Sequence, residues 1–125
     1  MKEKIKIGYI GCGTRGCWVL EGCLRHMKDV EFPIICDIRD KGMDCATNLL
    51  TEVGRPAPKR TYNYEEVLKD PEIDAVMIMT GWENRAEMAA KSLRAGKYTA
   101  IEVGCAFDLS ECFHLLEAYE ETKVP

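Results

Sequence analysis

The sequence predicts a doubly wound α/β fold with a parallel sheet, and three observations support this prediction. Short apolar, β-branched runs alternate with longer segments of helical periodicity throughout the 125 residues, as in successive βα units. The first apolar run leads directly into Gly11-x-Gly13-x-x-Gly16, which a helix-like segment follows. An acidic residue, Asp37, comes 21 residues after the last of these glycines. We therefore expect one three-layer domain with helices on both faces of the sheet.

The alternation divides the chain into strands and helices of ordinary length. Strands are expected near residues 4–10, 31–37, 59–62, 73–79 and 98–103, and helices near residues 14–28, 40–53, 64–70, 82–95 and 109–122. Apolar residues follow a helical period at Cys17, Leu20, Leu24 and Met27 in the first helix and at Phe113, Leu116 and Tyr119 in the last. We expect both stripes to pack in the core.

Local signals support these elements in order. The first strand has the β-branched, apolar character of a buried parallel strand. A capping residue stands three positions before a glutamate at Asn63–Glu66, Thr80–Glu83 and Asp108–Glu111, so each of these pairs should begin a helix. Gly54 and Gly96 stand where the second and fourth helices should end.

The glycine loop has the properties of a dinucleotide-binding turn. Gly11 allows the tight turn out of the strand, Gly13 lets the backbone approach a pyrophosphate, and Gly16 lets the helix pack closely on the sheet. The free N–H groups and positive dipole end of that helix would face the phosphates. The loop residues expected to contact the cofactor are Gly11, Cys12, Gly13, Thr14, Arg15 and Gly16.

Asp37 ends the second strand, where a carboxylate can accept hydrogen bonds from both ribose hydroxyls of the adenosine half. The additional 2′-phosphate of NADP would meet this negative charge, so the sequence favours NAD over NADP. Ile38 and Arg39 follow directly, and Arg39 could weaken the preference or simply flank the adenine. The alternative is a glycine-rich turn and a helix-capping Asp37 without any ligand.

Two further strand ends should flank the cofactor, because ligands of open α/β sheets bind beyond the carboxyl ends of the strands. Thr80 and Gly81 could touch the pyrophosphate or the nicotinamide ribose, and Trp82 and Asn84 could line the nicotinamide side. In the alternative, Thr80 only caps a helix and Trp82 only packs. At the end of the fifth strand, Glu102 is a candidate ribose or substrate contact, with Val103 beside it, or else a plain exposed acid.

Composition excludes several classes of protein. The net charge is −4 and there is no basic block, which argues against a nucleic-acid partner. Apolar runs are only a few residues long, so we expect no membrane span. The N-terminal MKEKIKIG enters a strand at once and lacks the apolar core of a signal peptide. The expected location is the cytoplasm.

The seven cysteines have no C-x-x-C spacing, and there are two histidines, His26 and His114. The sequence therefore predicts no metal site and suggests reduced thiols. Cys12, next to a helix N-terminus, could be a reactive thiolate or a small apolar filler of the turn. We expect neither histidine at the strand ends, so no general acid or base is evident.

The chain resembles the N-terminal, NAD(P)-binding half of the glucose–fructose oxidoreductase/inositol dehydrogenase family. The resemblance rests on IGYIGCGTRG, CDIRD, DPEIDAVMIMT followed by AEMAAKSLRAGK, and AIEVGCAF, in family order over nearly the whole length. It implies that residues 1–125 form a Rossmann domain without the larger α/β domain that follows it in the family. It further implies hydride transfer between a nicotinamide and a sugar, cyclitol or related alcohol, and a homo-oligomeric full-length protein. Because no general acid or base is evident, we expect residues 1–125 alone to be inactive.

One departure from the family pattern affects the expected reaction. Most members have Glu-Lys-Pro at the end of the fifth strand, where the lysine assists the chemistry, and this chain has Glu102-Val103-Gly104. Val103 can neither donate a hydrogen bond from its side chain nor carry a proton. A branch with this feature includes NAD-dependent glycosidases, in which a transient oxidation allows elimination of the glycoside. A non-enzymatic dinucleotide sensor and, less favoured, a methyltransferase are the remaining alternatives.

Overall fold

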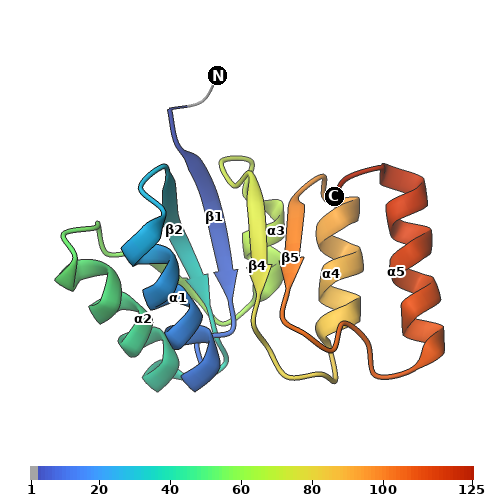
Figure 1. Ribbon diagram of the computed structural model, residues 1–125, viewed down its shortest axis with the longest axis horizontal. Helices are drawn as coiled ribbons and strands as arrows, with labels where there is room; N and C mark the ends of the chain where they lie inside the picture. The colour runs from blue at the N-terminus through green and yellow to red at the C-terminus, as the bar shows by residue number, and fades with distance from the viewer. Residues whose placement is uncertain (1–2) are drawn as a thin grey trace.

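Five parallel strands form one sheet in the computed structural model, which describes residues 3–125 (Figure 1). The strands are β1 (Ile5–Ile10), β2 (Val30–Cys36), β3 (Lys59–Thr61), β4 (Ala75–Ile78) and β5 (Tyr98–Ile101). Their order is β3-β2-β1-β4-β5, which confirms the doubly wound fold. Met1 and Lys2, at the start of the stretch where we expect no signal peptide, lie outside the described residues.

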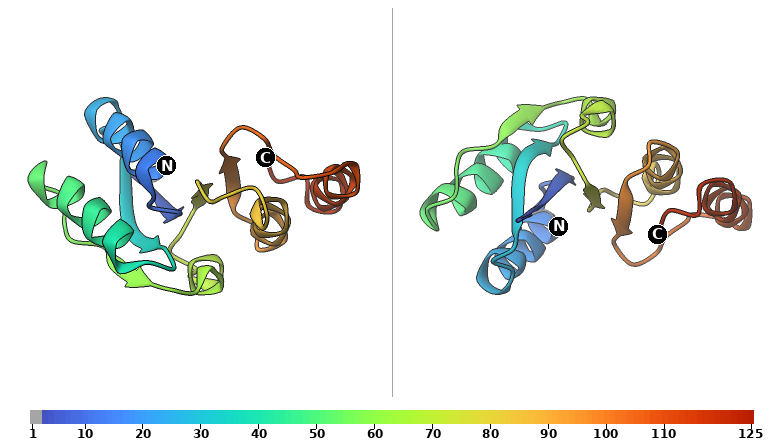
Figure 2. Two further views of the ribbon diagram at one scale, coloured as in Figure 1. Left: turned by 90° about the horizontal axis from the view of Figure 1, so that it is seen from below. Right: turned by 90° about the horizontal axis from the view of Figure 1, so that it is seen from above.

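Helices cover both faces of the sheet (Figure 2). They are α1 (Thr14–His26), α2 (Asp40–Glu52), α3 (Tyr64–Lys69), α4 (Arg85–Arg94) and α5 (Leu109–Thr122). α1 and α2 lie on one face, α3 and α4 lie on the other, and α5 packs against α4. No helix within residues 3–125 has both the length and the apolar character that crossing a bilayer requires.

The two core layers follow from the alternation of side chains along the strands. Tyr9 of β1 faces α1 and α2 and packs with Leu20 and Met43. Ile10, the next residue along β1, faces the opposite side and packs with Val67 of α3 and Val76 of β4. The same strand therefore supports both helical layers, and its carboxyl end is held firmly between them.

β1 pairs in unbroken register with β4, from Ile7 opposite Ala75 to Ile10 opposite Ile78. Its pairing with β2 is interrupted, because Lys6 lies opposite Glu31 while Gly8 lies opposite Ile34. Over this interval β2 has one residue more than β1, and the interval contains Pro33, which has no N–H to offer a neighbouring strand and is tolerated at such an irregularity. Beyond it the register is regular up to the strand end.

The apolar stripes of the first and last helices differ in burial. In α1 the stripe is buried as predicted at Cys17, Leu20 and Leu24. The prediction is wrong for Met27, which follows the helix end and is 38% exposed. In α5 the prediction of core burial is wrong, because Phe113, Leu116 and Tyr119 are 56%, 48% and 46% exposed. α5 packs on α4 through the buried Ala118 and the partly buried Leu115. β5 is the edge of the sheet, so no described strand lies beneath the remaining apolar side chains.

The capping predictions are confirmed in part. The Asn63 side chain accepts from Glu65 N at 3.0 Å, and Asp108 accepts from Glu111 N at 2.9 Å. The reciprocal contacts differ from a capping box, since the Glu111 carboxylate accepts from Phe107 N and not from the cap residue. Gly54 and Gly96 follow the ends of α2 and α4 with φ of +79° and +77°, as expected of helix-ending glycines.

Candidate dinucleotide-binding site

The carboxyl ends of the strands lie together along the lower edge of Figure 1, and the left view of Figure 2 looks onto that edge. β1 stands between β2 and β4, and the chain leaves β1 toward α1 on one face while α4 follows β4 on the other. This is the switch point at which open α/β sheets bind ligands. The loops that carry all the predicted site residues meet here.

The glycine loop adopts the close packing that its sequence predicts. Gly11 has φ of +95°, and a Cβ there would lie 2.6 Å from the backbone of Met79 at the end of β4. A Cβ on Gly16 would lie 2.2 Å from the carbonyl oxygen of Gly11. Both distances are too short for any side chain, so the turn and the helix contact depend on glycine. Gly13 differs, because nothing lies within 4 Å of its Cβ position.

The N-terminus of α1 is free to bind an anion. Gly13 is the N-cap residue and offers no side chain, and the first turn of the helix contains no acidic residue. Several N–H groups of this turn therefore lack an intrahelical partner and face the open space at Gly13. The buried Tyr9 hydroxyl donates to the Gly16 carbonyl oxygen at 2.7 Å. Burial raises the pKa of Tyr9 well above its ordinary value, so this donor stays protonated.

Asp37 lies directly after β2 and binds the glycine loop. One carboxylate oxygen accepts from Cys12 N at 2.7 Å, and the other accepts from Arg39 N at 2.9 Å. Each oxygen retains a lone pair that a ribose hydroxyl could use. Ile38 and Arg39 are exposed beside it. The predicted acid thus lies beside the glycine loop, with its orientation fixed by backbone amides.

Cys12 is buried and its thiol is not activated. Burial raises the pKa of the Cys12 thiol far above its ordinary value, and the nearby Asp37 carboxylate raises it further. Its sulfur contacts the Cys36 carbonyl oxygen at 3.8 Å. These features favour a filler of the turn over a reactive thiolate. All seven cysteines are free thiols.

The loop after β4 differs from its prediction in one respect. α4 begins at Arg85 with Asn84 as its N-cap, so the capping box predicted at Thr80–Glu83 is wrong. Thr80 and Gly81 lie in the loop after β4, and nothing lies within 4 Å of the Cβ position of Gly81. Trp82 is 53% exposed. Its ring covers Gly104 so closely that a Cβ there would lie 2.7 Å from a ring carbon.

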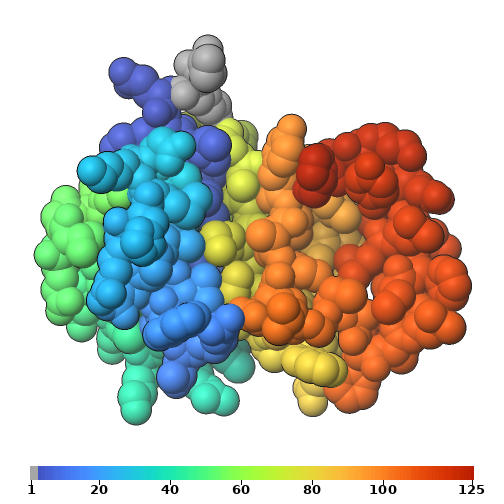
Figure 3. Space-filling view, in the orientation of Figure 1, coloured from blue at the N-terminus to red at the C-terminus, as the bar shows by residue number. Residues whose placement is uncertain are grey.

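The loop after β5 reaches back to the glycine loop. Glu102 accepts from Arg15 Nε at 3.1 Å and from Val103 N at 3.1 Å. The Arg15 guanidinium, the Val103 N–H and the charge of Arg85 hold the pKa of Glu102 below its ordinary value. In the space-filling view the start of α1, in blue, touches this loop, in orange (Figure 3). The Val103 side chain is 80% exposed and contributes no polar group.

Arg85 belongs to the same region and is absent from the sequence prediction. It is 3% exposed, and its guanidinium donates to the carbonyl oxygens of Thr80, Glu102, Val103 and Gly104. The sequence contains a pattern that indicates its burial, because Arg85 lies on the same helical face as the buried Ala89 and Leu93. An arginine on an otherwise apolar face indicates a buried polar contact.

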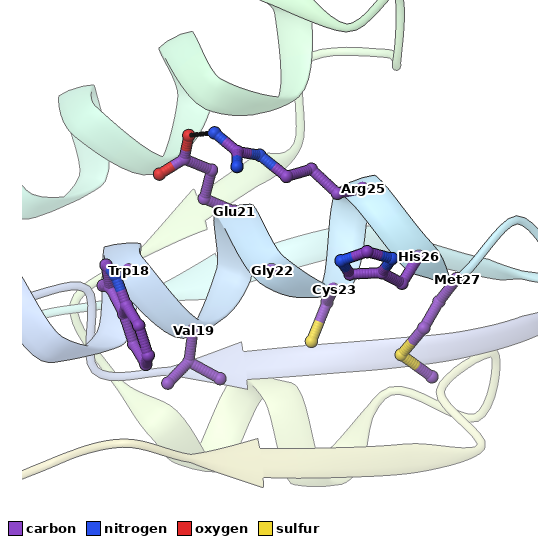
Figure 4. A pocket seen from close by; sticks show the side chains of 8 residues that line it. All are labelled: Trp18, Val19, Glu21, Gly22, Cys23, Arg25, His26 and Met27. Atoms are coloured by element: carbon purple, nitrogen blue, oxygen red, sulfur yellow. Dashed lines mark hydrogen bonds and ion pairs between the residues drawn. The ribbon is translucent and has the colours of Figure 1, made fainter.

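Other candidates lie away from the strand ends. A groove runs along α1 from Trp18 to Met27, and Figure 4 shows Val19 and Cys23 on one side of the helix with the Glu21–Arg25 ion pair on the other. His26 is the last residue of α1, and His114 lies on α5, as predicted. Within the described part of the chain, no group of three or more histidine, cysteine or acidic residues could hold a metal ion.

Residues 5–125 match a protein family described as an oxidoreductase family with an NAD-binding Rossmann fold. A protein named Glycosyl hydrolase family 109 protein 2, from Phocaeicola vulgatus, is 32% identical over 95% of this chain and 29% of its own length. An alpha-N-acetylgalactosaminidase from Shewanella oneidensis is 33% identical over 97% of this chain and 27% of its own length. The chain therefore spans less than a third of these curated relatives.

The solved structure of myo-inositol 2-dehydrogenase from Lactobacillus plantarum superposes with a TM-score of 0.83 at 19% identity. The superposition covers 95% of this chain and 34% of that one. At this identity the likeness supports the fold alone, and it agrees with the Rossmann topology described above.

Proposed function

The chain belongs to this oxidoreductase family with an NAD-binding Rossmann fold, and we propose that it binds NAD at the strand ends and orients the nicotinamide toward a sugar-like substrate. The observation that carries the proposal is the uncapped start of α1, with open space at Gly13. A pyrophosphate fits this arrangement, because it needs free N–H groups, a positive helix end and no side chain in the way. Asp37 supplies the matching ribose contact.

We propose NAD over NADP as the cofactor. The Asp37 carboxylate is fixed toward the site by the amides of Cys12 and Arg39, and a 2′-phosphate would meet its negative charge. Arg39 is exposed nearby and would soften this preference without reversing it. Calorimetric titration of the 125-residue chain with NAD and with NADP tests this. Saturable NAD binding with weaker NADP binding is expected; absent NAD binding or a clear NADP preference contradicts the proposal.

The nicotinamide of bound NAD supplies hydride acceptance and donation, and the chain supplies binding and orientation. We propose that Gly11–Gly16 hold the pyrophosphate, Asp37–Arg39 hold the adenosine ribose, and the remaining contacts come from the strand ends of β4 and β5. These last are Thr80, Gly81, Trp82, Asn84, Glu102 and Val103. Val103 carries no proton, and we place the general acid and base outside residues 1–125.

Residues 1–125 act in this proposal as one dinucleotide-binding domain of a larger enzyme. The support is the share of the curated relatives that the chain spans, 27–29%. The substrate contacts and the acid–base residues would then lie in the remaining part. We propose a homo-oligomeric cytoplasmic enzyme that acts on small carbohydrate molecules, and no turnover by residues 1–125 alone. Substrate oxidation by the isolated chain would contradict this.

We propose net oxidation or reduction of a sugar, cyclitol or related alcohol as the first candidate reaction. NAD-assisted glycoside cleavage is the second, and a specific observation favours it. Val103 replaces the lysine of the family pattern, and the curated relatives include a protein named alpha-N-acetylgalactosaminidase. Cleavage would return the hydride within one turnover, so it would consume no NAD overall.

A single assay of the full-length protein separates the two reactions. A net oxidoreductase accumulates NADH with its alcohol substrate, which absorbance follows directly. A glycosidase of the second kind releases nitrophenol from nitrophenyl glycosides, requires added NAD, and leaves the NAD concentration unchanged. NAD-independent release, or no release across a panel of glycosides, would contradict the second candidate.

A further inference from the structure

A buried arginine joins the two loops on the β4–β5 side of the site. The Nε and Nη2 atoms of Arg85 both donate to the Thr80 carbonyl oxygen, the former at 3.1 Å. The Nη1 atom donates to the carbonyl oxygens of Glu102, Val103 and Gly104 at 3.2, 2.6 and 2.9 Å. One edge of the guanidinium therefore holds the end of β4, and the other holds the loop after β5.

The arrangement requires an arginine and not merely a positive charge. Burial of a cation is costly unless its hydrogen-bonding groups are satisfied. All five hydrogen bonds end on backbone carbonyl oxygens, so Arg85 fixes backbone positions whatever the neighbouring side chains are. A lysine ammonium is a single point donor and cannot span two loops as the planar guanidinium does.

The adenosine side of the site is held by different contacts. There, Asp37 accepts from Cys12 N, and Gly16 packs on Gly11. Arg85 contributes to none of these contacts. The residues that it binds lie in the loops after β4 and β5, which belong to the second mononucleotide-binding half of a Rossmann domain. The two halves are therefore held by different sets of contacts, and the Arg15–Glu102 ion pair joins them.

We propose that Arg85 is a positioning residue for the nicotinamide half of the dinucleotide site. Through the Thr80 carbonyl on one side and Glu102–Gly104 on the other, it sets the width of the opening between the β4 and β5 loops. The Trp82 ring packs on Gly104 across that opening, so displacement of either loop would also move the Trp82 ring. The proposal rests on the proposed function, since it assumes that NAD binds at these strand ends.

The test compares NAD with ADP, which carries the adenosine half without nicotinamide. Calorimetry on the wild-type chain and on Arg85→Lys should show NAD binding weakened by about tenfold in the variant, as for a lost charged hydrogen-bond pair. ADP affinity should stay within about twofold. A general loss of structure would lower both affinities together, so their ratio separates positioning from mere stability.

The matched control is Arg94→Lys, on the same helix. Arg94 forms an exposed ion pair with Glu121 at 2.9 Å, and its substitution should change neither affinity. If the wild-type chain binds neither NAD nor ADP, the proposed function fails. If the wild-type chain binds both and Arg85→Lys lowers them equally, or lowers neither, the role of Arg85 is overturned.

A second measurement needs no variant and covers the case in which Arg85→Lys does not fold. The buried, hydrogen-bonded Nε–H of Arg85 should give its own signal in a ¹⁵N-correlated NMR spectrum of the wild-type chain. The signal should shift on addition of NAD and stay in place on addition of ADP. A signal that responds to both ligands alike, or to neither while NAD binds, contradicts the proposal.

Discussion

The loops after β1 and β2 are held together differently from the loops after β4 and β5. In the first pair, Gly16 packs on the backbone of Gly11, and Asp37 binds an amide of the glycine loop directly. In the second pair, one side chain, that of Arg85, reaches into both loops and binds their carbonyl groups. The first half depends on the absence of side chains, and the second half depends on the presence of one.

This difference predicts that mutations will affect stability and binding in separable ways. Contacts of the glycine loop contribute to the fold itself, because α1 packs on β1 through them. Contacts of the β4–β5 side order exposed loops and should matter more for the ligand than for the fold.

Gly16→Ala should lower the free energy of unfolding by about 3 kcal/mol, because the new methyl group would collide with the Gly11 carbonyl oxygen. Gly13→Ala is the matched substitution, since nothing lies within 4 Å of its Cβ position. It should cost less than about 1 kcal/mol and yet abolish NAD binding. Urea unfolding measures the first effect and calorimetry the second. Equal destabilisation by both substitutions would contradict the claim that packing requires a glycine at Gly16 and not at Gly13.

Asp37→Ala should lower the free energy of unfolding by about 2 kcal/mol, because Cys12 N loses a charged acceptor. It should weaken NAD and ADP binding together, in contrast to Arg85→Lys, because the ribose contact belongs to the shared adenosine half. Unfolding in urea and paired titrations with both ligands measure this. Retention of ADP affinity would show that Asp37 supports the turn only.

Gly104→Ala should cost about 1 kcal/mol, because Gly104 has φ of +77°, which an L-residue adopts unfavourably. Its methyl group would also push the Trp82 ring aside. We expect weaker NAD binding, unchanged ADP binding and an altered tryptophan emission spectrum. Loss of ADP binding in this variant would indicate that the two halves are coupled.

Glu102→Gln should have the smallest effect on stability, and that effect should depend on pH. Arg15 holds the pKa of Glu102 below its ordinary value. The resulting stabilisation is present above the pKa of the unfolded chain and is lost as the pH falls through the lower pKa of the folded state. The variant should therefore be less stable than wild type near neutral pH, and the difference should shrink below about pH 4. A difference that grows on acidification would contradict the ion pair.

The sequence predicts those features that depend on backbone geometry within a short segment of the chain. Gly11, Gly16 and Asp37 are specified by backbone geometry within one βαβ unit, so their spacing alone indicates the turn. The doubly wound parallel sheet also followed from the alternation of elements. Whether these residues bind the cofactor remains a prediction.

The features that the sequence did not disclose depend on contacts between distant segments. Arg85 binds Gly104, 19 residues away, and Arg15 binds Glu102, 87 residues away. The predicted burial of the α5 stripe is wrong for a related reason. An apolar stripe at helical spacing does not show whether a strand lies beneath it. α5 begins and ends as predicted, yet Phe113 and Leu116 face solvent.

The most direct test is an NMR titration of the ¹⁵N-labelled wild-type chain with NAD and, separately, with ADP. Both ligands should shift the amide signals of residues 13–16 at the start of α1. NAD alone should also shift those of residues 80–84 and 102–104. Shifts confined to the groove along residues 18–27, or no saturable shifts with NAD, would contradict a dinucleotide site at the strand ends.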